Sequence, residues 1–230
     1  MAKKKKTENE EIVLGSNPVE KYQRPLAIAG IGLIAAAVIF LVYQRFYLEP
    51  MQEESVNEMF EAEKWYAKDS FDLALNGNIS FLGFADIADE YGLTDAGELA
   101  HYYAGVCHLN LALGSDSLVR EDHLNSAVEY LRKFNSGSKM LQPIALGACG
   151  DAYSDLGEYA EAASYYGKAA NADNNEYTTP MYLKKQGLVY EELGDYQKAV
   201  KAYQRIKNDF GTTTQGNGID KYITRAQSKL

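Results

Sequence analysis

Two stretches of this sequence decide its fold: residues 150–169, GDAYSDLGEYAEAASYYGKA, and residues 187–206, GLVYEELGDYQKAVKAYQRI. They recur at a spacing of 37 residues and share a glycine, a Leu-Gly pair, an alanine and a tyrosine at the same internal positions. These shared residues are Gly150 and Gly187, Leu156-Gly157 and Leu193-Gly194, Ala162 and Ala199, and Tyr166 and Tyr203. Self-similarity at such a spacing is typical of proteins that are built from stacked supersecondary units.

The shared residues suit a pair of closely packed helices. A glycine inside a helix is unfavourable by about 1 kcal/mol relative to alanine, so Gly150 and Gly187 indicate places where a second helix approaches too closely for a Cβ. Gly157 and Gly194 fit the left-handed residue that commonly ends a helix. The pattern resembles the tetratricopeptide repeat (TPR), in which a unit of about 34 residues forms two antiparallel helices.

A third and looser copy of the pattern lies upstream. Gly105, Ala127, Leu131 and Phe134 match the glycine, the alanine and the apolar positions that follow it. The segment Leu113–Arg120 is expected to lengthen the turn between the two helices of this copy.

The sequence therefore predicts an all-α protein in which a single transmembrane helix precedes a TPR solenoid of antiparallel helix pairs. Before the repeats, an amphipathic pattern over residues 51–76 predicts one long helix, and Pro50 is expected to end the helix that leaves the membrane. The predicted parts are a disordered cytoplasmic tail (1–20), the transmembrane helix and its flanks (21–49), first helices in a degenerate TPR-like unit (50–93), TPR repeats (94–210) and a C-terminal capping helix (211–230).

The transmembrane prediction depends on Leu26–Tyr43, LAIAGIGLIAAAVIFLVY, which contains no charged residue. As a helix, this segment would span about 27 Å, close to the thickness of a bilayer's hydrocarbon core. A cleaved signal peptide is the alternative, but its apolar region would be shorter and would end in a small-x-small site. We therefore expect an uncleaved anchor, on which Gly32 and Ala36 form a small-xxx-small pair that could contact another membrane helix.

Charge sets the expected orientation and excludes one class of partner. Six lysine and arginine residues lie just before the apolar segment, so the positive-inside rule places the N-terminus in the cytoplasm and the remaining chain outside it. The protein carries a net charge of −9, and residues 26–230 hold 17 basic against 28 acidic residues. Such an acidic domain would be repelled by phosphate backbones, so nucleic-acid binding is not expected.

No catalytic motif or cofactor-binding motif is present, and we predict a protein that is not an enzyme and has no small-molecule substrate. His101, Cys107 and His108 cluster on one predicted helix, but a metal site would need further ligands. We therefore predict that these side chains pack in a core or a groove, and we name no metal ligand. Cys107 and Cys149 are expected to face a core as free thiols; a disulfide between them is the alternative.

A binding surface can be predicted from the repeats, because the first helix of each TPR unit lines a concave wall. In this chain the wall would carry Tyr102, Val106, Asn110, Asp151, Ser154, Asp155, Lys184, Leu188, Glu191 and Glu192. Only Lys184 resembles the basic set with which some TPR domains hold a peptide carboxylate. The acidic wall therefore predicts a basic or amphipathic partner segment.

The whole layout resembles a bacterial family, the YfgM-like ancillary subunit of the SecYEG translocon. The stretches that carry the resemblance are VEKYQRPLAIAGIGLIAAAVIF (19–40) and YGLTDAGELAHYYAGVCHLNLA (91–112). The resemblance implies a single-pass protein of the bacterial inner membrane with a periplasmic TPR domain. It also implies that SecYEG and a PpiD-like periplasmic chaperone are its partners in protein export.

The same architecture would also suit a scaffold for another cell-envelope machine, such as one for cell division or outer-membrane assembly. A metal-dependent activity at His101 and His108 is a third hypothesis. Recovery of SecY and a PpiD-like protein with the chain would support the translocon hypothesis.

Overall fold

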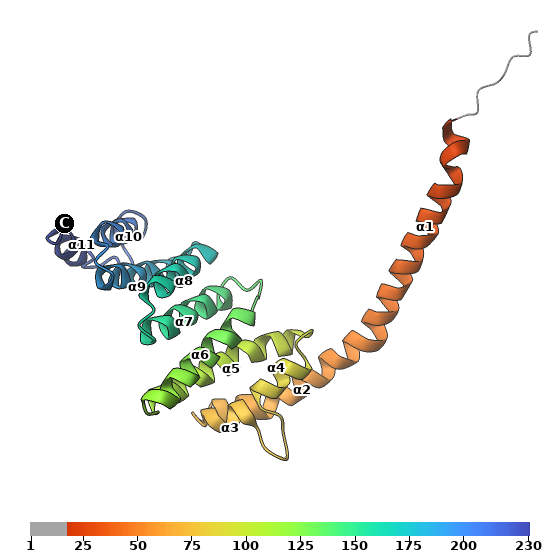
Figure 1. The fold of residues 1–230 in the computed structure, drawn as a ribbon, viewed down its shortest axis with the longest axis horizontal. Helices are drawn as coiled ribbons and strands as arrows, with labels where there is room; N and C mark the ends of the chain where they lie inside the picture. Colours follow the sequence, from red (N-terminus) through yellow and green to blue (C-terminus); the bar gives the residue numbers. More distant parts are fainter. Residues whose placement is uncertain (1–17) are drawn as a thin grey trace, which may run out of the picture. The chain divides into compact units, whose positions relative to one another are not determined.

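The computed structural model describes residues 18–230, with side chains from residue 25 onward, and this part of the chain is helical (Figure 1). The tail predicted for residues 1–20 therefore falls outside the described residues except for its last three. The chain divides into two units, residues 1–49 and residues 50–230.

The first unit contains α1 (Pro18–Tyr43), followed by a π-helical turn at Gln44–Leu48. Within the described residues, one helix is long and apolar enough to cross a membrane, and an 18-residue window of it has a mean hydropathy of 2.6. Its large apolar side chains are exposed, from Leu26 at 67% to Val42 at 52%. An exposed apolar surface of this length is unfavourable in water, and its length matches the hydrocarbon core of a bilayer.

The prediction that Pro50 ends this helix was wrong. The helix continues from Pro25 to Tyr66, and α2 (Glu49–Tyr66) includes Pro50. The π-helical turn explains how proline is accommodated: the Glu49 N–H bonds to the Gln44 carbonyl, five residues back, immediately before Pro50. This wider turn relieves the clash between the proline ring and the preceding turn, where proline has no N–H to donate.

The single long helix predicted for residues 51–76 is also broken in the structure. It consists of α2 and α3 (Phe71–Asn76), separated by a turn in which Asp69 has a φ of 57°. Together with α4 (Phe84–Glu90), these helices pack with α5 (Asp95–Leu113) around a buried core of Met59, Ala62, Leu75, Phe84, Ile87 and Ala100.

The repeats form three successive helix pairs that stack side by side in Figure 1. The pairs are α5 (Asp95–Leu113) with α6 (Ser117–Lys133), α7 (Leu141–Asp155) with α8 (Tyr159–Ala172), and α9 (Thr178–Glu192) with α10 (Tyr196–Asp209). The expectation of a long turn at Leu113–Arg120 was wrong, because only residues 114–116 separate α5 from α6. The additional residues lengthen the two helices instead.

The glycines have the roles that the sequence predicts. A Cβ on Gly150 would lie 2.6 Å from Cδ1 of Tyr166, and one on Gly187 would overlap the ring of Tyr203. Gly157 and Gly194 end their helices with φ of 76° and 72°. The close approach of each pair is therefore built around a glycine on the first helix and an aromatic ring on the second.

A short final helix, α11 (Asp220–Gln227), covers the end of the stack. Its Ile223 and Ala226, together with Ile219, join a buried cluster that includes Tyr203 and Ile206 of α10. Exposed ends of a repeat stack need such a cap, because the last unit has no further neighbour to bury its apolar face.

Candidate functional site

The residues predicted for the concave wall lie on α5, α7 and α9, the first helices of the three pairs. On α5, Tyr102 and Val106 are half-buried against the core that α5, α6 and α7 share. The ring of Tyr102 lies 5.6 Å from that of Phe134. The side-chain amide of Asn110 donates to the Val106 carbonyl at 2.8 Å. In this part of the wall the side chains therefore pack against the core or bond to their own helix, and little open polar surface is left for a ligand.

On α7, the carboxylate of Asp151 is the centre of a polar network. The Tyr166 hydroxyl donates to it at 2.6 Å, and the Lys185 ammonium of α9 lies 2.6 and 2.8 Å from its two oxygens. Burial and the neighbouring Asp151 charge raise the pKa of Tyr166. Ser154, one turn further along, is half-buried near the same hydroxyl.

A second network, again of a carboxylate, a tyrosine and a cation, forms around Glu191 on α9. The Tyr203 hydroxyl donates to Glu191 at 2.6 Å, and the Arg225 guanidinium of α11 forms a bidentate pair with it at 2.7 and 2.8 Å. Burial acts to raise the pKa of Glu191, but the hydrogen bonds from Arg225 and Tyr203 outweigh burial and hold that pKa below its usual range.

These networks change the predicted charge of the wall. Of its four carboxylates, Asp151 and Glu191 are paired as described, and Asp155 pairs with Arg120 at 3.2 Å. Glu192 remains exposed. Because most of the negative charge has an intramolecular partner, the wall is much less acidic than its residues alone suggest.

The two remaining predicted wall residues, Lys184 and Leu188, lie one turn apart on α9. The Lys184 ammonium is 4.8 Å from the ring centre of Tyr222 on α11. Leu188, one turn after Lys184, is 37% exposed. Both can contact a ligand.

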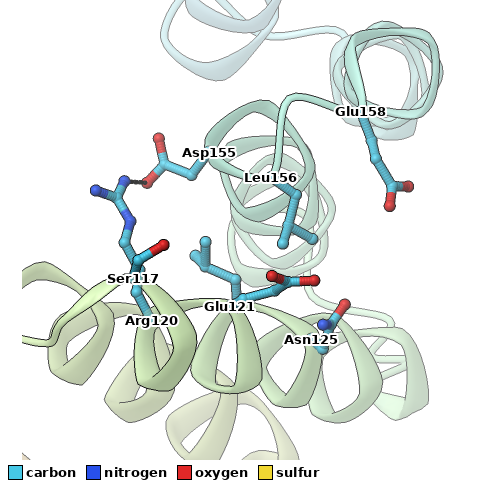
Figure 2. Close-up of a pocket in the computed structure, with 8 residues that line it drawn as sticks. Ser117, Arg120, Glu121, Asn125, Asp155, Leu156 and Glu158 are labelled. Atoms are coloured by element: carbon cyan, nitrogen blue, oxygen red, sulfur yellow. Dashed lines mark ion pairs between the residues drawn. The ribbon is translucent and has the colours of Figure 1, made fainter.

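A polar cleft of about 410 Å³ lies between α6 and the turn that joins α7 to α8. Figure 2 shows Arg120 and Asp155 paired at one side of it, with Glu121 and Asn125 projecting from α6. Glu158 borders the same cleft. Asp155 was predicted as a surface residue but the cleft was not, because most of its other side chains come from α6, the second helix of the preceding pair.

A second cleft, of about 250 Å³, is mainly apolar and lies between α2 and α5. Its lining consists of Gln52, Val56, Met59, Glu63, Asp95, Ala96 and Leu99. Val56 is 56% exposed although it is apolar. This cleft too was not predicted; its one signal in the sequence was the amphipathic pattern of residues 51–76, from which only a long helix was predicted.

Comparison with protein families supports the repeat assignment at the two strongest copies. Residues 145–176 and residues 185–213 each match a model of the tetratricopeptide repeat. The chain carries TPR units. The matched segments cover most of α7–α8 and most of α9–α10, the pairs that supply the carboxylate and the tyrosine of each polar network. No curated protein matches the sequence.

The histidines of α5 and α6 do not gather in the way that the metal hypothesis needs. His108 Nδ1 lies 3.0 Å from Nδ1 of His123 on α6, whereas His101 Nδ1 lies 2.9 Å from the Gly97 carbonyl oxygen. Within residues 25–230, no group of three or more potential metal ligands was found. Burial, with the nearby His123, lowers the pKa of His108 to about 4.

The two cysteines are buried and free, on α5 and α7 of the TPR stack. Burial raises the pKa of both Cys107 and Cys149 to about 12. Both thiols are therefore protonated and unreactive near neutral pH.

The proposed membrane contact at Gly32 and Ala36 is on the exposed surface of α1. Nothing lies within 4 Å of a Cβ placed on Gly32. The pair stays a prediction, because its partner would be another membrane helix.

Proposed function

We propose that this protein is a membrane-anchored adaptor whose TPR stack binds other proteins and performs no chemistry. The repeats support this function, since TPR units form interaction surfaces. The observation that carries the proposal is the cleft between α2 and α5, where apolar side chains are left open to solvent at the start of the stack. An exposed apolar patch rimmed by polar residues is typical of a site that binds a partner.

The chemistry of this cleft indicates what it binds. Val56, Met59 and Leu99 supply the apolar part, while Glu63 and Asp95 place carboxylates beside it. Among the described residues, neither carboxylate forms an ion pair. A partner helix with an apolar face and a lysine or arginine at its edge would satisfy both features.

The site of action is proposed from the anchor. One apolar helix precedes the TPR stack, and basic residues are concentrated on its N-terminal side. The positive-inside rule then places the N-terminus in the cytoplasm and the TPR stack in the periplasm of a bacterium with an inner membrane. The resemblance of residues 19–40 and 91–112 to the YfgM-like family supports SecYEG and a PpiD-like chaperone as partners, and assistance to protein export as the role.

Site-specific cross-linking in intact membranes tests this function. A photoreactive amino acid at Val56 should cross-link to SecY or to a PpiD-like chaperone, whereas the same group at the exposed Lys139 should not. The double variant Glu63→Lys with Asp95→Lys should lose the cross-link. Glu161→Lys with Glu176→Lys is the matched control, because it changes the charge equally on the exposed surface near α8.

The identity of the captured protein separates the alternatives. Capture of a cell-division or outer-membrane-assembly protein at Val56 would keep the adaptor function but replace the translocon with another envelope machine. If no protein is captured at Val56 under conditions in which the chain is intact and membrane-bound, the adaptor proposal fails.

A further inference from the structure

The charge of the second unit is divided unequally along the chain. Residues 50–180 contain seven lysine and arginine residues against 22 aspartate and glutamate residues. Residues 181–230 contain nine basic against five acidic residues. The stack is therefore strongly acidic from α2 to α8 and basic from α9 to α11. An asymmetry of this kind steers different partners to different ends of a protein.

The basic end has a defined centre at Tyr222 on α11. The ammonium groups of Lys184 and Lys221 lie 4.8 and 5.2 Å from the centre of its ring, and the Arg225 guanidinium lies 5.0 Å from it. The three cations come from two helices, and Lys184 on α9 precedes Lys221 on α11 by 37 residues. They are brought together only when α11 packs against α9 and α10.

These cations differ in whether a carboxylate compensates them. Glu191 pairs with Arg225, whereas Lys184 and Lys221 form no ion pair in the part of the chain that the structure describes. Lys221 is exposed and Lys184 is partly exposed. Two ammonium groups therefore face the same aromatic ring with their charges available to a ligand.

Apolar side chains adjoin the two ammonium groups. Met181 and Leu188 lie three residues before and four residues after Lys184, so all three side chains share one face of α9. Leu188 is 37% exposed. The surface thus offers an apolar strip beside two cations and an aromatic ring.

We propose that Lys184, Leu188, Lys221 and Tyr222 form a docking surface for an acidic segment of a partner protein. Glutamate or aspartate side chains would pair with the two ammonium groups, and an apolar side chain of the same segment would pack on Leu188 and Tyr222. This surface is separate from the α2–α5 cleft and of opposite charge. It does not depend on the proposed place of the protein at the translocon.

A protein segment fits this surface better than a lipid surface does. Polybasic sites for anionic lipids typically gather four to eight lysine and arginine residues, whereas only two uncompensated cations meet here. Their convergence on one ring also suits a few discrete carboxylates. The acidic half of a second copy is a further candidate, but such head-to-tail contacts would leave both ends of the assembly open to further growth.

Peptide binding to the full-length protein in detergent tests the proposal. The probe is a short fluorescent peptide of alternating glutamate and leucine, and its control is the peptide with lysine in place of every glutamate. The glutamate peptide should bind, more weakly as salt increases. Lys184→Glu and Lys221→Glu should each weaken binding by about tenfold. Lys139→Glu, an equal charge change on a distant exposed loop, should leave it unchanged.

Three results would overturn the proposal. The first is that the glutamate peptide binds the double variant, Lys184→Glu with Lys221→Glu, as tightly as it binds the wild type, or that it does not bind the wild type at all. The second is that these substitutions abolish binding to vesicles containing phosphatidylglycerol but do not affect the peptide, which would assign the surface to lipid. The third is concentration-dependent self-association that the substitutions remove while peptide binding persists, which would assign it to a second copy.

Discussion

The helix pair α5–α6, called the first unit here, and the two TPR units that follow it fill the same close contact in different ways. In α5–α6, Gly105 faces Leu131, whose Cγ would lie 2.5 Å from an added Cβ. In α7–α8 and α9–α10, the corresponding glycines face Tyr166 and Tyr203. The backbone geometry is shared, but an aliphatic side chain fills the contact once and a tyrosine fills it twice.

Whether leucine or tyrosine fills the contact goes together with the polarity of the neighbouring residues. Val106 follows Gly105, whereas Asp151 follows Gly150; and Ala148 of α7 has the position that Lys185 has in α9. A tyrosine hydroxyl at a tight contact needs an acceptor, and a half-buried carboxylate needs a cation. The polar residues therefore occur as a set, and each set ties a helix pair to the next helix along the stack.

The largest effect is expected where a ring is tightly enclosed. Gly187→Leu should destabilise the protein by about 3 kcal/mol or more, because the new side chain would overlap the ring of Tyr203, which is wholly buried. Thermal melting of the full-length protein in detergent, followed by circular dichroism, measures this loss. Gly114→Leu is the control, since open space surrounds Gly114. Melting of Gly187→Leu at the wild-type temperature would disprove the repeat alignment.

The polar set of Asp151, Tyr166 and Lys185 can be replaced by the apolar residues that stand at the matching positions around the first unit. Asp151→Val alone should cost about 2 kcal/mol, because it removes the carboxylate that pairs Tyr166 with Lys185. The triple variant with Tyr166→Leu and Lys185→Ala reproduces the residues of the first unit and should recover part of that loss. Urea unfolding of the three proteins measures the difference. A triple variant that is less stable than Asp151→Val would show that the apolar set cannot replace the polar one here.

Acid should affect the first unit before the others. The pKa of His108 is about 4 in the fold against 6.5 unfolded, so its contribution to stability is complete above pH 6.5 and is lost as pH falls toward 4. Allowing for its partial exposure, we expect a loss of about 1 kcal/mol between pH 7 and pH 5. The network at Glu191, whose pKa is lowered, should persist until pH falls below the usual glutamate range.

The pH prediction is checked by melting the wild type and His108→Asn across this pH range. The pH-dependent loss should be smaller in the variant, because asparagine has no proton to gain. His108 packs against His123 and Tyr130, so His123→Asn is a useful comparison. Equal pH dependence in the wild type and His108→Asn would rule out His108 as the cause.

The sequence predicted the repeats well because local geometry imposes them. Gly157 and Gly194 are read directly from their place after a helical pattern. Gly150 likewise indicates a close helix contact, but the ring of Tyr166 was not predicted to fill it. The passage of the helix through Pro50 was missed, because it depends on a shift of hydrogen-bond register in the preceding turn.

The charge of the wall was predicted poorly for a different reason. Whether Asp151 or Glu191 can attract a partner depends on a cation that comes 34 residues later in the chain. The equal separation of Asp151 from Lys185 and of Glu191 from Arg225 was visible in the sequence. This equal spacing becomes meaningful only once α7 is known to lie beside α9, and α9 beside α11.

The smallest effect is expected at the junction between the first two units. Arg120 and Asp155 pair at 3.2 Å with side chains that are 42% and 45% exposed, and exposed pairs contribute about 0.2–1 kcal/mol to stability. Arg225→Ala should cost roughly twice as much, because Arg225 is bidentate and the Glu191 side chain is only 13% exposed. Urea unfolding of Arg120→Ala and Arg225→Ala tests this order. Equal losses would mean that the junction at Arg120 depends on its ion pair as strongly as the junction at Arg225 does. The contrast between a first unit with an apolar contact and two later units with ionic contacts would then no longer hold.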